Sequence, residues 1–358
     1  MRQLEARARR RWRAAIVLTA VLAVAAPATA QVPARLSGPS DGASLSGTER
    51  VFATRSCGEY RLLTISAITD GCRSPDVVKT AIEDKLGGDA LPDRPKPWPW
   101  AVEHRTLITG AAIGGVVGFT AANSLLGYDK KPFHFHQEGW FDADTTDGGA
   151  DKASHFTDYY VITKEFGYFY QKIGYSESQA RWLALGTTML GGFINELSDG
   201  FTNHGFSPED LLMDWGGGAV ATLISATRTG DLFGFRASHV PGATYIHDVY
   251  AADLKLAGVA DRLGLNVGPL RFLFVSLTYG VKGYRGGGTP ADQQRQVGLE
   301  IGLNLEEILN AVGVNRDRWW GYALHVVADN LRFPYTAIGL RYDLNHSRWH
   351  GPNGGNFD

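Results

Sequence analysis

Hydrophobic residues follow two different periods along the chain, and the change between them divides it. In residues 106–127 almost every position is apolar or small, and three later segments place apolar residues at helical spacing. After Gly230 the pattern becomes strict alternation, clearest in residues 273–282 and 297–304. We therefore expect an α+β protein in which a glycine-rich apolar bundle of about four helices precedes an antiparallel β-sheet.

Local signals mark the ends of the expected helices. Gly174 is typical of a residue that ends a helix, and Ser176 with Gln179 has the spacing of a capping box. Ser207 followed by Pro208 is typical of a helix start. The expected helices are 106–127, 151–173, 176–196 and 207–226, within a membrane-associated helical domain at 101–230.

Strands are expected in a sheet domain at residues 231–345. Besides the two alternating segments, residues 322–327 and 338–342 predict strands, and residues 286–288 predict a loop. The polar residues 346–358 are expected to form a disordered tail.

Glycines recur at every fourth position of the first apolar segment, at Gly110, Gly114 and Gly118. This spacing lines one helix face with glycine and lets another helix approach closely. The segment is nearly long enough to span a bilayer, but a buried hairpin helix fits the same pattern. Both interpretations stay open at this point.

The first thirty residues have the composition of a secretory signal. Six arginines precede an apolar stretch at residues 14–25, and Ala28 and Ala30 form an A-x-A cleavage site. An uncleaved anchor helix is the alternative. Export to an oxidising compartment favours a disulfide between Cys57 and Cys72. Residues 31–100 are then a flexible N-terminal region that ends in an extended linker rich in proline and tryptophan.

The charge balance excludes one class of partner. The chain has a net charge of −2, and removal of a signal with six arginines and one glutamate changes it to −7. A nucleic-acid-binding protein needs a basic surface, so we expect no nucleic acid partner.

Ionisable residues inside the apolar helices are the strongest functional signal. Charge in such surroundings is costly unless it is paired, so it marks either an internal ion network or a working site. The candidate residues are Asp151, Lys152, His155, Tyr159, Glu196, Asp199, His204, Asp210 and Asp214. Asp151, His155 and Tyr159 share one helix face, as do Asp210 and Asp214 on theirs.

Three uses of these residues remain open. The first is a structural network of ion pairs and helix caps. The second is a site in which His155, Glu196 and Asp199 hold a divalent metal such as zinc, or act catalytically with Lys152 stabilising an anion. The third is ligand binding without catalysis. His134 and His136 are interpreted as part of an aromatic loop at a membrane interface.

The same residues resemble a known family. The motifs Asp151-Lys152-x-x-His155, Glu196-x-x-Asp199-Gly200 and Gly205-Phe206-Ser207-x-x-Asp210 are similar to those of the uncharacterised family of predicted periplasmic lipoproteins that includes YfiM of enterobacteria. The resemblance extends over about residues 105–345 and implies a compartment rather than an activity. Longer members carry Asn where this chain has Asp214, and this chain lacks the lipoprotein cysteine. A weaker resemblance is to VanZ-like membrane proteins.

These observations together predict an exported cell-envelope protein of a Gram-negative bacterium, in the periplasm or outer membrane. The expected function is a non-enzymatic component that binds membrane lipid or an envelope protein. The alternative is a hydrolase or transferase that acts at the membrane interface on a lipid or glycan.

Overall fold

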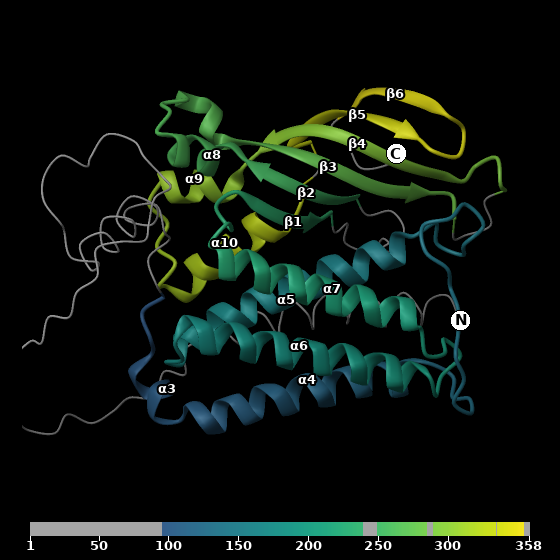
Figure 1. Ribbon diagram of the computed structural model, residues 1–358, viewed down its shortest axis with the longest axis horizontal. Coiled ribbons are helices and arrows are strands. Elements are labelled where there is room, and N and C mark those ends of the chain that lie inside the picture. Colours follow the sequence, from purple (N-terminus) through teal and green to yellow (C-terminus); the bar gives the residue numbers. More distant parts are fainter. Residues whose placement is uncertain (1–94, 239–248, 285–288, 334, 354–358) are drawn as a thin grey trace, which may run out of the picture. The chain divides into compact units, whose positions relative to one another are not determined.

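The computed structural model describes residues 95–238, 249–284, 289–333 and 335–353. The predicted signal peptide, the Cys57–Cys72 disulfide and the loop at 286–288 lie outside these ranges and stay predictions. Within the described part, helices come first and an antiparallel sheet follows (Figure 1), so the α+β architecture predicted from the sequence is confirmed.

The predicted bundle is present as four long helices. They are α4 (Arg105–Gly127), α5 (Ala150–Lys172), α6 (Glu177–Asp199) and α7 (Pro208–Thr227). Ser176 and Gln179 form the predicted capping box at the start of α6, and Ser207 accepts a hydrogen bond from the Asp210 amide at the start of α7. The linker is not extended to its end, because Pro99 begins the short helix α3 (Pro99–Glu103).

Glycines bring α5 and α7 together. A Cβ atom on Gly217 would lie 2.1 Å from the carbonyl oxygen of Phe156, so only glycine fits this contact. The close approach expected at α4 is not found among the described residues: Cβ atoms on Gly110, Gly114 and Gly118 would meet no described atom within 4 Å. These glycines lie on an open face of α4, and the helix contacts α6 through other residues, including Val116.

The sheet is a meander in the strand order β1-β2-β3-β4-β5-β6, with every neighbouring pair antiparallel. Its strands are β1 (Phe233–Ala237), β2 (Val249–Lys255), β3 (Leu273–Lys282), β4 (Gln294–Leu303), β5 (Ala337–Asp343) and β6 (Arg348–Asn353). Short helical elements stand between the strands: α8 (Leu256–Leu263), η2 (Gly268–Phe272), α9 (Leu305–Ala311) and α10 (Trp319–Asn330). Helix α5 packs against β1, where Phe156 and Tyr160 contact Phe235.

Two predictions about this part of the chain were wrong. Residues 322–327 lie in helix α10 and not in a strand, because Tyr322, His325 and Val326 are buried at the spacing of a helix face. Part of the expected disordered tail is strand β6, in which Trp349 packs on Tyr342 and Arg348 contacts Asp343.

The two faces of the sheet have an unusual distribution of side chains. Leu277, Leu299 and Leu340 form a row across β3, β4 and β5 and are exposed, the first two by 64% and 61%. The alternate positions carry buried charges: Glu300 accepts hydrogen bonds from both Arg332 and Arg341. A sheet in water normally buries its apolar face and exposes its polar face, and here the arrangement is reversed.

Candidate functional site

Lys152 is the centre of a buried ion cluster that joins α5, α7 and the loop before α5. Its ammonium donates to Glu138 Oε2 at 2.7 Å, Asp151 Oδ2 at 3.2 Å and Asp210 Oδ1 at 2.5 Å. Burial alone would lower the pKa of Lys152, but these three carboxylates raise it, so the group remains charged. Burial and the neighbouring acids raise the pKa of Glu138 to about 8.

His155 lies one turn further along α5, between carboxylates on both sides of its ring. Nδ1 is 2.7 Å from Asp214 Oδ1 on α7, and Nε2 is 3.9 Å from Asp151 Oδ1. The Asp214 side chain is fully buried, whereas 22% of the His155 side chain is exposed. Burial would lower the pKa of His155, but the charges of Asp214, Asp210 and Asp151 raise it well above its usual value.

Glu196 completes the cluster from the last turn of α6. It is buried, accepts a hydrogen bond from the Ser207 amide at 3.1 Å and another from the Asn195 side chain at 3.2 Å. Burial raises its pKa to about 8, with the nearby carboxylates of Asp210 and Asp214 adding to the shift.

Backbone features position these side chains. Gly149 adopts a left-handed conformation (φ 83°) just before α5. Asp151 follows in the first turn of this helix, where the positive end of the helix dipole stabilises a carboxylate. Asp210 occupies the matching first turn of α7. On α6, a Cβ atom at Gly192 would lie 2.7 Å from Asp214 Oδ2, so this glycine leaves the space that Asp214 occupies.

Most of the residues singled out from the sequence do meet. Asp151, Lys152, His155, Asp210 and Asp214 interact directly, and Glu196 lies close to His155 and Asp214. Tyr159 belongs to the same region: burial first, and then the charges of Asp214 and Glu196, raise its pKa well above the usual value.

Asp199 and His204 lie beside the cluster and not among its directly interacting residues. Asp199 accepts a hydrogen bond from Asn195 at 3.2 Å, and it is in neither group of described residues whose ligand atoms are close enough to share a metal ion. The two groups are Asp151, His155 and Asp210, and His155, Glu196 and Asp214. His204 packs edge-on against Tyr128, with ring centroids 4.0 Å apart.

Glu138 was missed by the sequence analysis. It follows the aromatic loop around Phe133 and Phe135, where no helical or strand period places it next to other charges. The loop is partly held by backbone hydrogen bonds from His134 to Gly200 and from His136 to Phe206. The exposed aromatic side chains of this loop lie against Phe201 and Phe206, close to the ends of α6 and α7.

The cluster has an excess of acidic groups. Five carboxylates, from Glu138, Asp151, Glu196, Asp210 and Asp214, lie around one ammonium and one imidazole. When protonated, His155 has no free lone pair and can donate a proton or a hydrogen bond; when neutral, it keeps one nitrogen lone pair that can accept a proton or bind a metal ion.

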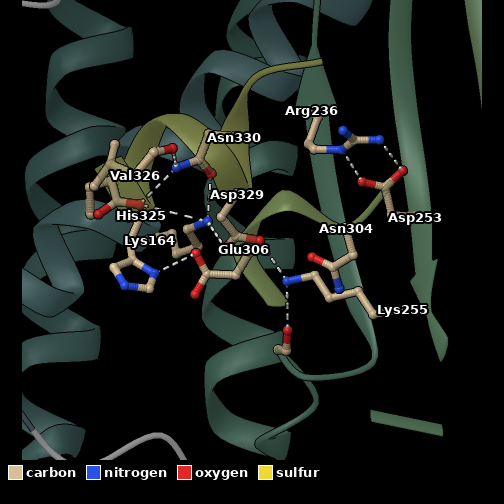
Figure 2. Close-up of polar contacts among 12 residues, drawn as sticks. Lys164, Arg236, Asp253, Lys255, Asn304, Glu306, His325, Val326, Asp329 and Asn330 are labelled. Atoms are coloured by element: carbon tan, nitrogen blue, oxygen red, sulfur yellow. Dashed lines mark hydrogen bonds and ion pairs between the residues drawn. The ribbon is translucent and has the colours of Figure 1, made fainter. Parts of the chain in front are cut away.

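A second buried network, at the contact of α5 with α10, differs in its charge balance. Figure 2 shows Lys164 and Lys255 converging on Asp329 from two sides, at 2.8 and 2.7 Å. Glu165 accepts hydrogen bonds from Tyr322 and Asn330 at the same contact. Two lysines thus face two carboxylates, as expected of a structural ion-pair network.

Comparison with known proteins finds a similarity to one family over part of the chain. Residues 137–226, which include the cluster, match the family DUF2279, described as predicted periplasmic lipoprotein. No curated protein and no solved structure matches the chain. The family match supports an exported protein of the periplasm or cell envelope, as predicted from the sequence, and carries no information on activity or partners.

Proposed function

We propose that this protein is a membrane-associated component of the Gram-negative cell envelope that contacts lipid through the apolar face of its sheet and through α4. The observation that carries the proposal is the reversed sheet. Exposed leucines and isoleucines cover one face of β3, β4 and β5, while the charged residues lie on the buried face.

The exposed apolar face is too continuous for a surface in contact with water. Soluble proteins rarely expose large contiguous apolar patches, and such patches mark contacts with membranes or partners. The face carries Leu277, Leu299, Leu303, Ile301, Ile338, Leu340 and Trp349. We favour lipid because Trp349 is exposed on β6 at the margin of the face, and tryptophan is enriched where proteins meet the lipid–water interface.

Helix α4 supports the same proposal. Among the described helices it alone has the length and the apolar composition needed to cross a bilayer. Only 6% of the apolar stretch of this helix is buried in the structure, which argues against the alternative of a buried core helix. Leu107, Phe119 and Leu126 are exposed along it, together with the glycine face.

The ion cluster has a structural role in this proposal. It ties α5, α6 and α7 to the loop that contains Glu138, and so fixes their relative positions while apolar surfaces face lipid. A buried charged group that keeps its partners specifies one arrangement of helices, since any other arrangement leaves charges unpaired.

The test measures the polarity around two positions with an environment-sensitive fluorophore attached at each. Leu340→Cys carries the dye on the exposed sheet face, and Ala291→Cys carries it in the exposed β3–β4 connection as a matched control. Both are made in a chain with Cys57→Ser and Cys72→Ser and are mixed with phosphatidylcholine vesicles.

We expect the dye at position 340 to shift to the blue and to be quenched by a lipid-borne quencher, while the dye at 291 stays in water. If position 340 remains in water although the protein floats with the vesicles, the sheet face is not the lipid contact. If the folded protein does not float at all, membrane association is wrong.

A second candidate function is a hydrolase or transferase that acts at the membrane interface on a lipid or glycan. It is favoured by one observation: the buried Asp214 orients the partly exposed His155 from behind, as a carboxylate orients a catalytic histidine. His155 would serve as an acid, with Glu196 and Lys152 nearby. Loss of turnover in His155→Gln with an unchanged folding transition would support this candidate, and turnover retained by that variant would exclude it.

A further inference from the structure

The excess of carboxylates at the α5–α7 contact has a use beyond membrane association. We propose that Asp151, His155 and Asp210 bind a divalent transition-metal ion, and that Asp214 holds the His155 imidazole in the orientation that binding requires. The site is independent of the lipid contacts and would be present in either candidate function.

The ligand atoms are close enough to converge. One oxygen of Asp151, one nitrogen of His155 and one oxygen of Asp210 all lie within 4.8 Å of one another. Ligands of a tetrahedral zinc ion lie roughly 3.3 Å apart, given bonds of about 2.0–2.1 Å. Asp151 and His155 stand one turn apart on α5, so small side-chain rotations bring Nε2 and Oδ1 from 3.9 Å to that spacing.

The imidazole already has the orientation of a metal ligand. Its Nδ1 lies 2.7 Å from Asp214, which leaves Nε2 directed toward Asp151. Metal-binding histidines almost always donate their second ring N–H to a carboxylate or carbonyl, which fixes the tautomer and the ring. Asp214 is buried at a position where Gly192 leaves room for its side chain.

Lys152 does not saturate the ligand oxygens. It contacts Asp151 through Oδ2, and the other oxygen of that carboxylate, Oδ1, is the one that faces His155. It contacts Asp210 through Oδ1 alone.

The charges of the two buried networks also favour an additional cation at this site. The α5–α10 network has equal numbers of lysines and carboxylates, whereas in the α5–α7 cluster Asp151, Asp210 and Asp214 share one lysine and one histidine. When His155 binds an ion as a neutral imidazole, these three aspartates exceed the one lysine by two charges, which a divalent ion would balance.

The donor set selects the class of metal. One imidazole and two carboxylates suit zinc, manganese or iron better than calcium, which prefers oxygen ligands alone. Asp151 and His155 are each partly exposed, so an ion can enter from solvent and keep a water molecule as a further ligand. Three protein ligands with one open position are typical of catalytic rather than structural zinc sites.

The experiment uses the full chain in mild detergent, stripped with a chelator and titrated with Zn²⁺ and with Mn²⁺ by calorimetry. Metal content after dialysis is measured by mass spectrometry. The variants are Asp151→Asn, His155→Gln, Asp210→Asn and Asp214→Asn. The matched control is His346→Gln, because His346 also lies 2.7 Å from a buried carboxylate, Asp343, but is in neither group of converging ligands.

We expect one ion per chain in the wild type and in His346→Gln. Asp151→Asn and His155→Gln should each weaken binding at least 100-fold, and Asp214→Asn should weaken it about 10- to 100-fold as the partner of a ligand. Far-UV circular dichroism checks that each variant is folded. Absence of saturable binding by the folded wild type would overturn the proposal, as would unchanged affinity in folded Asp151→Asn and His155→Gln. Vesicle flotation is measured on the same samples, so failure of this site and failure of membrane association are distinguishable.

Discussion

Lys152 on α5 and Asp210 on α7 are 58 residues apart in the chain, yet their charged atoms lie 2.5 Å apart. The same ammonium binds Glu138 from the preceding loop and Asp151 from its own helix. A lysine this deeply buried is stable only while its carboxylates surround it, and the carboxylates depend on it equally. This one side chain therefore connects three segments of the helical region.

Substitution of Lys152 should lower the free energy of unfolding. In Lys152→Met the aliphatic stem is kept, but Glu138, Asp151 and Asp210 lose their shared counter-charge. We expect the free energy of unfolding to fall by about 3–5 kcal/mol, the usual cost of breaking a buried ion pair. Denaturant unfolding measures it, with Lys131→Met as the control because Lys131 is exposed and should change stability by less than about 0.5 kcal/mol. Equal, small changes in both variants would show that the cluster does not stabilise the fold.

Alanine substitutions at two adjacent glycines of α7 should change the stability of the fold in opposite directions. A Cβ atom on Gly217 would lie 2.1 Å from the Phe156 carbonyl oxygen, whereas on Gly216 it would lie 3.7 Å from the Phe156 ring. Gly216→Ala should raise stability by up to about 1 kcal/mol through helix propensity. Gly217→Ala should lower it by about 1–3 kcal/mol, because α5 and α7 must separate. Thermal unfolding of the pair checks this, and stabilisation by both substitutions would contradict the close contact.

The helices and the convergence of their charges could be predicted because both depend on local spacing. Ser176 with Gln179 and Ser207 with Pro208 mark helix starts through hydrogen bonds within one turn. Residues of one helix face, such as Asp151 and His155, stay together whatever the tertiary structure. The partner of Lys152 in the loop, Glu138, could not be predicted in this way, because a loop has no period.

The sheet shows where spacing alone is insufficient. Alternation predicted strands β3, β4 and β5 and one polar face, but it cannot tell which face is covered. Residues 322–327 are rich in β-branched and aromatic residues and resemble a strand, yet contacts such as Tyr322 with Tyr168 favour a helix. Tertiary packing decided both outcomes.

The stability of the sheet should depend on the buried charge of Glu300. Its two oxygens accept hydrogen bonds from Arg332 and Arg341, and all three side chains are buried. Glu300→Gln removes the negative charge that two buried guanidinium groups share, so we expect the free energy of unfolding to fall by about 3–5 kcal/mol. Glu307→Gln is the control: Glu307 pairs with the more exposed Arg271, and an exposed pair contributes less than about 1 kcal/mol. Denaturant unfolding compares them, and equal losses would refute a special role for the buried pair.

The Asp329 pair should make stability depend on pH in the acid range. Burial alone would raise the pKa of Asp329, but Lys164 and Lys255 hold it well below its usual value (Figure 2). A carboxylate with a lowered pKa stabilises the fold fully above its unfolded pKa of about 3.9, and this contribution is lost as the pH falls through the folded value.

The stability difference between the wild type and Asp329→Asn should therefore be largest at pH 6 and shrink steadily as the pH falls below about 4. Urea unfolding at a series of pH values from 6 to 2 measures the difference. Asp292→Asn is a suitable control, since Asp292 is exposed and, among the described residues, its carboxylate bonds to Thr289 of its own turn. A difference between wild type and Asp329→Asn that stays constant with pH would mean that the pKa of Asp329 is the same in the folded and unfolded states. The two lysines would then not control its ionisation.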